Sequence, residues 1–89
     1  MPGISRDNDT AGGDLIPSQS TVKVNNELVI VHGDKVEPHD PGGVHSTPQP
    51  TMVAGSKNVF IGGKAVVNAG DAATCGHLAT GSGDVSVGD

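Results

Sequence analysis

The sequence predicts a small all-β protein built from three β-hairpin repeats. Its 89 residues include 14 Gly and 6 Pro. These residues separate short apolar runs from one another and are not gathered into one low-complexity tract. Several of these runs alternate at period two or are rich in Val and Ile, as short strands are. The same order of strand, tight turn and strand recurs along the chain, and such recurrence indicates repeated structure.

The first hairpin is expected between residues 21 and 31. Residues 21–24 read Thr-Val-Lys-Val and alternate at period two, and residues 28–31 read Leu-Val-Ile-Val. Asn25 and Asn26 lie between these runs, and Asn tolerates the positive φ angles of a two-residue hairpin turn. The pattern therefore predicts two antiparallel strands joined by this turn.

A second hairpin repeats this pattern in residues 58–67. Its turn is Gly62-Gly63, between residues 58–61 and residues 65–67. The two hairpins superpose without a gap. The superposition pairs Val22 with Val59, Val24 with Ile61, and Gly33-Asp34 with Gly70-Asp71.

The third repeat is expected to be split between the two ends of the chain. Residues 81–89 follow the pattern of residues 55–63 and stop at their own turn. Residues 4–9 align with residues 66–71 and are the candidate for the returning strand. Pairing the two ends gives the fold pseudo-threefold symmetry and closes a ring, which protects strand edges that otherwise favour aggregation.

The candidate metal ligands lie in two of the segments that connect the repeats. If the tight turns share one end of the molecule, the connecting segments at about 10–20, 35–56 and 72–81 gather at the other. Of the four His and one Cys in the chain, four residues fall in the two later segments: His39, His45, Cys75 and His77. One thiolate and three imidazoles suit tetrahedral zinc, although these spacings are not those of a standard zinc finger. The alternative is that they are ordinary loop histidines and a buried cysteine.

A metal would also compensate for the small size of the core. A chain of this length buries only about 60% of the surface that its unfolded form exposes. Bound zinc supplies roughly 10 kcal/mol of apparent folding free energy in small domains. Cys75 is the only cysteine, so an intrachain disulfide is excluded and a reducing assembly site is expected.

Three other features are expected to be structural. His32 follows an apolar run, where the second repeat has Ala69, and we expect a strand or surface residue rather than a ligand. Gly33-Asp34 and Gly70-Asp71 are expected to form turns in which the Asp side chain accepts local backbone N–H groups. Phe60 is the only aromatic residue, and it either covers a neighbouring loop or anchors a partner.

Composition excludes several classes of protein. The formal net charge of −5 leaves no basic stripe for phosphate groups, so no nucleic-acid partner is expected. No apolar run is long enough for a signal peptide or a membrane span. Residues 1–89 are expected to form one domain without an extension.

These motifs resemble the PAAR-repeat proteins, which form spike tips in type VI secretion systems and contractile phage tails. The strongest match is Gly55-Ser56 through Asp71, followed by Cys75-Gly76-His77 and Thr80-Gly81-Ser82. Residues 65–68 read Ala-Val-Val-Asn where the family has Pro-Ala-Ala-Arg. The resemblance implies a sharp β-cone with a metal near its apex. Zinc is expected there rather than iron, and the implied ligands are His39, His45, Cys75 and His77.

The resemblance also implies a mechanical function. One chain would cap a trimeric β-helical spike and sharpen it, touching the target membrane only mechanically. Assembly would take place in the bacterial cytoplasm, and the chain would become part of a phage tail or a secreted spike. Two alternatives remain open, a small zinc-dependent hydrolase and a virion decoration protein that binds another symmetric partner. A hydrolase needs an open coordination position for water, whereas four protein ligands close the site.

Overall fold

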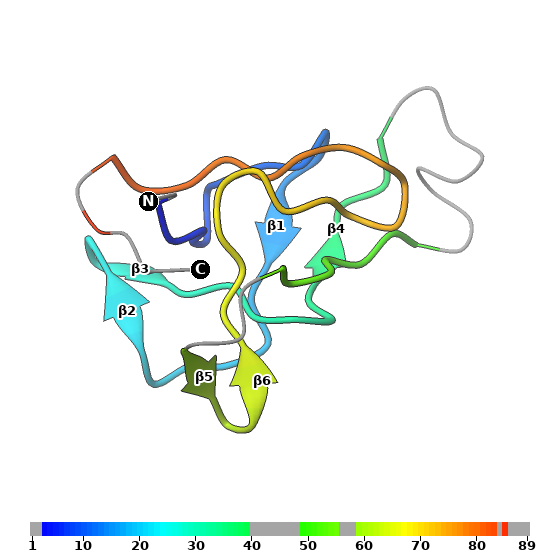
Figure 1. Cartoon of the computed structure of the whole chain (residues 1–89). Coiled ribbons are helices and arrows are strands. Elements are labelled where there is room, and N and C mark those ends of the chain that lie inside the picture. Colours follow the sequence, from blue (N-terminus) through cyan, green and yellow to red (C-terminus); the bar gives the residue numbers. More distant parts are fainter. Residues whose placement is uncertain (1–2, 40–48, 56–58, 84, 86–89) are drawn as a thin grey trace.

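The computed structural model describes residues 3–39, 49–55, 59–83 and 85 (Figure 1). Within these ranges the chain is all-β: six two-residue strands form three antiparallel two-stranded sheets, and there is no helix. The Cα atoms extend 32 × 24 × 21 Å along the principal axes. Among the described residues there is accordingly no helix of the length and apolar character needed to cross a membrane.

The first predicted hairpin is confirmed. Strand β2 (Lys23–Val24) pairs antiparallel with β3 (Glu27–Leu28). Asn25 and Asn26 join them with φ angles of 54° and 66°. Two successive positive φ angles define the turn that best follows the twist of a β-ribbon, which explains the Asn pair.

The second predicted hairpin has the same geometry. Strand β5 (Phe60–Ile61) pairs antiparallel with β6 (Lys64–Ala65). Gly62 and Gly63 form its turn with φ angles of 59° and 82°. The two hairpins therefore reach the same turn with different residues that tolerate positive φ.

The third hairpin joins the two ends of the chain, as predicted. In each repeat one backbone N–H donates to the carbonyl across the hairpin, at 3.1, 3.0 and 2.9 Å. The three equivalent pairs are Val29 to Val22, Val66 to Val59, and Ile4 to Val85. The rest of the predicted pairing, at residues 86–88, and the predicted turn at Gly88-Asp89 lie outside the described residues.

The strands are shorter than the apolar runs that predict them, because the returning runs leave their hairpins and meet at the centre. There, Ser5 donates its N–H to the carbonyl of Val67, Val67 donates to Ile30, and Ile30 donates to Ser5, at 2.9, 2.9 and 3.0 Å. All three residues are fully buried. This closed cycle of hydrogen bonds gives the fold its pseudo-threefold symmetry.

Apolar residues pack on the central cycle in two clusters. The smaller cluster takes one residue from each repeat, Ile4, Val29 and Val66, with Val24 and Ile61 against it. The larger cluster includes residues of the connecting segments and is listed here in full: Ala11, Leu15, Ile30, Val36, Met52, Val67, Ala73 and Ala79.

An aspartate turn ends each of the three central runs. In each turn the Asp Oδ2 accepts the N–H of the residue three positions earlier, at 2.8 to 2.9 Å. The residue before each Asp has a positive φ angle between 81° and 92°. The three pairs are Gly33-Asp34, Gly70-Asp71 and Asn8-Asp9. The predicted turns at Asp34 and Asp71 are confirmed, and the turn at Asp9 is a third one that was not predicted.

The connecting segments gather away from the hairpin turns, as predicted. Strand β1 (Leu15–Ile16) of the first segment pairs antiparallel with β4 (Lys35–Val36) of the second. Single bridges join Lys35 to Thr51 within the second segment and Met52 of that segment to Ala73 of the third. In Figure 1 the β5–β6 turn lies at the bottom and the β2–β3 turn at the left, whereas segment 72–79 lies at the upper right. The molecule thus has a hairpin end and a connecting-segment end.

Candidate metal centre

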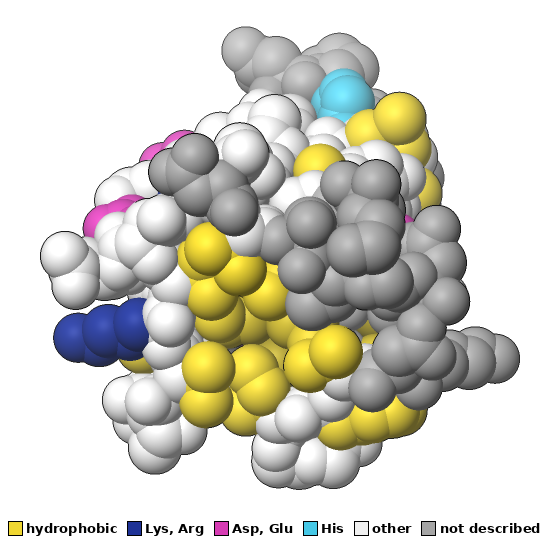
Figure 2. Space-filling view, turned by 60° about the vertical axis from the view of Figure 1, so that its left-hand side comes forward, with side chains coloured by type: hydrophobic (Ala, Val, Ile, Leu, Met, Phe, Trp, Pro, Cys, Tyr) yellow, Lys and Arg dark blue, Asp and Glu magenta, His cyan; other side chains and the backbone are white. Residues whose placement is uncertain are grey.

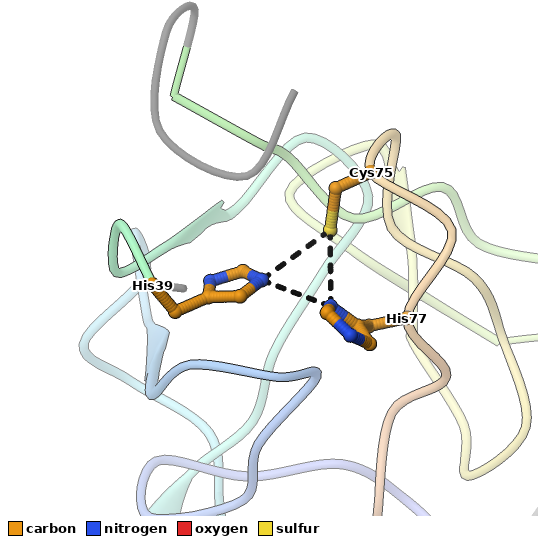
Figure 3. A group of neighbouring side chains, drawn as sticks. All are labelled: His39, Cys75 and His77. Atoms are coloured by element: carbon orange, nitrogen blue, oxygen red, sulfur yellow. Dashed lines mark hydrogen bonds between the residues drawn. The ribbon is translucent and has the colours of Figure 1, made fainter. Parts of the chain in front are cut away.

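Three of the four predicted ligands meet in the structure. His39 Nε2 lies 3.7 Å from Cys75 Sγ and 2.9 Å from His77 Nδ1, and the Cys75–His77 distance between the same atoms is 3.6 Å (Figure 3). All three side chains are half-buried. His45, the fourth predicted ligand, lies outside the described residues.

The tautomer of His39 is set by the backbone that carries it. Its Nδ1 lies 2.7 Å from the carbonyl of Glu37, which only accepts hydrogen bonds, so Nδ1 carries the proton. Glu37 is itself fixed, because its N–H donates to the carbonyl of Asp14 at 2.8 Å. Nε2 of His39 therefore presents a lone pair to Cys75 and His77. A backbone carbonyl that fixes the other ring nitrogen is the usual arrangement for a metal-binding histidine.

Cys75 and His77 face each other because they flank a tight turn. Ala73 donates its N–H to the carbonyl of His77, and Gly76 donates to Ala73, both at 2.9 Å. Gly76 has a φ of 95°, which residues with a side chain rarely adopt. The Cys-Gly-His turn therefore places both ligand atoms on the same side of the chain.

The donor set fits a tetrahedral metal ion. Zinc bonds of about 2.0 Å to nitrogen and 2.3 Å to sulfur place neighbouring ligand atoms about 3.3 to 3.5 Å apart. The two sulfur–nitrogen distances, 3.6 and 3.7 Å, are close to this value. The two nitrogens are slightly closer, at 2.9 Å, which is a hydrogen-bond distance. A thiolate with imidazoles favours zinc over magnesium or calcium, which prefer oxygen.

His32 is separate from this group. It is exposed, and its Nδ1 accepts the backbone N–H of Ala54 at 3.1 Å. Of the two predicted possibilities, a strand residue or a surface residue, the structure shows the second.

Sequence reasoning missed two glycines that pack against the ligands. A Cβ on Gly12 would lie 2.2 Å from His77 Nδ1 and 2.7 Å from His39 Nε2. A Cβ on Gly13 would lie 2.4 Å from the Glu37 carbonyl and 2.9 Å from His39 Nδ1. The first connecting segment thus contributes backbone to the centre although it holds no His or Cys. The sequence signal that could have identified them is the Gly12-Gly13 pair in the first connecting segment.

The hairpin end carries a second candidate site. Val22, Val59 and Val85 occupy equivalent positions in the three repeats and are 40%, 37% and 37% exposed. Figure 2 turns the left-hand side of Figure 1 forward and shows apolar side chains gathered on this face. Phe60, beside Val59, is 55% exposed, so it does not cover a loop among the described residues. We call Val22, Val59 and Val85 the valine ring.

Comparison with known proteins gives one family. The family model described as PAAR motif matches residues 6–79, a range that includes all four predicted ligands. No curated protein matches the chain.

Proposed function

The chain belongs to the PAAR motif family, and on this basis we propose that it is a structural tip that caps a trimeric β-helical spike. The motif is consistent with such a role in secretion systems and phage tails. In the proposal, one chain binds one spike trimer through its hairpin end. The spike assembles in the bacterial cytoplasm and contacts a target membrane only mechanically.

The observation that carries the proposal is the pseudo-threefold symmetry of a single chain. The same hairpin hydrogen bond recurs three times within 0.2 Å, and the same three positions hold exposed valines. A spike with a threefold axis offers three equivalent patches. One rigid body that engages all three avoids the entropy cost of ordering three separate subunits.

Exposure at the valine ring supports docking at the hairpin end. Three apolar side chains that are each more than a third exposed lie next to the smaller apolar cluster. Burying apolar surface contributes about 25 cal/mol per Å², so a matching apolar surface on the spike would bind favourably. The ligand group lies on the connecting segments and stays outside such an interface.

In the same proposal, zinc holds the connecting segments together at the apex. His39, Cys75 and His77 would bind it, with His45 as the fourth ligand. The ion would link segments that are distant in sequence, since His39 is 36 positions from Cys75. Four protein ligands leave no position for a substrate water, so the proposed centre is structural rather than hydrolytic.

Charge at the valine ring tests the docking surface. Val22→Asp and Val59→Asp should each weaken binding to the spike at least tenfold, because the carboxylate would have to be buried without a partner. Val53→Asp is the matched control: Val53 is 47% exposed but lies in a connecting segment.

Binding is measured by titrating each zinc-loaded variant against the trimeric β-helical spike protein of the same genome. Unchanged zinc content in all three variants separates docking from metal binding. If Val53→Asp weakens binding and the two ring variants do not, the chain docks through the wrong end for this proposal.

A further inference from the structure

Gly12 lies against the two ligand nitrogens of the candidate metal centre. The Cβ that any other residue would carry there falls 2.2 Å from His77 Nδ1, 2.7 Å from His77 Cγ and 2.7 Å from His39 Nε2. Carbon atoms do not approach nitrogen this closely without a bond. A side chain at this position would therefore compete for the space beside both ligand atoms.

The two histidine rings cannot move aside from such a side chain without taking a ligand nitrogen out of the group. His39 is held by the 2.7 Å hydrogen bond from Nδ1 to the Glu37 carbonyl, so moving its ring breaks that bond. His77 is fixed to the Cys-Gly-His turn, and its Nδ1 is the atom that faces Cys75. Rotating either ring takes a ligand nitrogen away from the group.

The loop that carries Gly12 is tied to the same elements. Ala11 donates its N–H to the Gly13 carbonyl at 3.0 Å, and Thr10 bridges to Asp14. Asp14 in turn accepts the N–H of Glu37, the residue that fixes the His39 tautomer. The loop therefore cannot move away from the centre independently of His39.

We propose that Gly12 is a positioning residue of the metal centre: its lack of a side chain leaves free the space beside His39 Nε2 and His77 Nδ1 that a bound ion needs. This inference rests on the proposed metal binding. It assigns the first connecting segment a role in a centre whose ligands all come from the other two.

An alanine at Gly12 would introduce backbone strain as well as the clash, because Gly12 has a positive φ angle that disfavours side chains. Two other glycines with the same backbone conformation provide a matched control for this strain. The φ of Gly12 is 85°, and the φ angles of Gly33 and Gly70 are 88° and 92°. A Cβ on either of these two would meet nothing within 4 Å. Gly33→Ala and Gly70→Ala thus introduce the same backbone strain as Gly12→Ala without a clash at the centre.

The experiment compares zinc affinity of the three alanine variants in competition with a chromophoric chelator. Gly12→Ala should bind zinc at least tenfold more weakly than the native chain, a loss typical of disturbed ligand positioning. Gly33→Ala and Gly70→Ala should stay within about twofold. With cobalt(II) as a probe, Gly12→Ala should also lose the thiolate-to-metal absorption that the control variants keep.

Thermal unfolding in excess chelator separates positioning from folding. Without metal, Gly12→Ala should unfold within a few degrees of the two control variants, and added zinc should raise the midpoint of the controls only. Native zinc affinity in Gly12→Ala would overturn the inference, and so would unfolding of metal-free Gly12→Ala while the metal-free controls stay folded. A native chain that binds no zinc would instead refute the proposed metal centre.

Discussion

At the residue scale, the candidate centre depends on hydrogen bonds that prepare each ligand. His39 presents Nε2 because Glu37 accepts from its Nδ1, and Cys75 faces His77 because Gly76 adopts a φ of 95°. The residue types, together with the predicted placement of their two connecting segments at one end of the molecule, were enough to group these three. The role of Gly12 was not predictable, because its contact with the ligands is made between segments distant in sequence.

Removing a ligand should remove the metal. Cys75→Ser or His77→Ala should lose most of the bound zinc and lower the thermal midpoint, because a bound structural ion contributes several kcal/mol to folding. Elemental analysis of the purified variants measures the zinc directly. His32→Ala is the control and should keep its zinc, since the His32 ring accepts the backbone N–H of Ala54 and is not part of the ligand group. Full zinc occupancy in both ligand variants would refute the assignment.

At the element scale, local chemistry predicted the turns, and non-local pairing decided the strands. Asn25-Asn26 and Gly62-Gly63 fit their turns through φ angles that their own side chains allow. The apolar run at residues 28–31 predicted a longer strand than the observed β3 (Glu27–Leu28). The observed strand is shorter because Ile30 pairs with Ser5 and Val67 rather than across the hairpin. A hydrophobic pattern shows that a run is buried but does not identify its partner.

The aspartate turn at Asp9 gives a pH-dependent contribution to stability. Burial alone would raise the pKa of Asp9, but hydrogen bonds from Arg6 and Thr80 outweigh it and lower the pKa. Arg6 Nε lies 2.9 Å from Asp9 Oδ2, and Thr80 Oγ1 lies 3.0 Å from Oδ1. Because the folded pKa is below the unfolded one, the contribution is full above the unfolded value of 3.8 and is lost as the pH falls through the folded value.

Asp9→Asn should therefore destabilise the protein by about 1.5 to 3 kcal/mol at neutral pH, the range for hydrogen bonds to a charged group. The difference from the native chain should shrink as the pH falls below about 4. Urea unfolding in excess chelator measures it without the acid-induced loss of metal. A difference that stays constant from pH 7 to pH 2 would contradict the ionic role of this turn.

At the scale of the whole molecule, one chain reproduces threefold symmetry by joining its two ends. The first two repeats were evident from the sequence, since they superpose without a gap. The third rested on one apolar position and a final Asp, yet Ile4 bonds to Val85 as the other repeats predict. The exposure of the valine ring followed only from the fold, because the strand pattern does not show which face stays uncovered.

We predict that one pseudo-threefold chain binds one partner with a threefold axis, and native mass spectrometry tests this most directly. The full chain is co-expressed with the trimeric β-helical spike protein of its own genome, and the intact complex is weighed. The predicted mass corresponds to one chain and one zinc ion on each spike trimer. A mass with three chains per trimer would contradict the account, because each hairpin repeat would then have no patch of its own to engage.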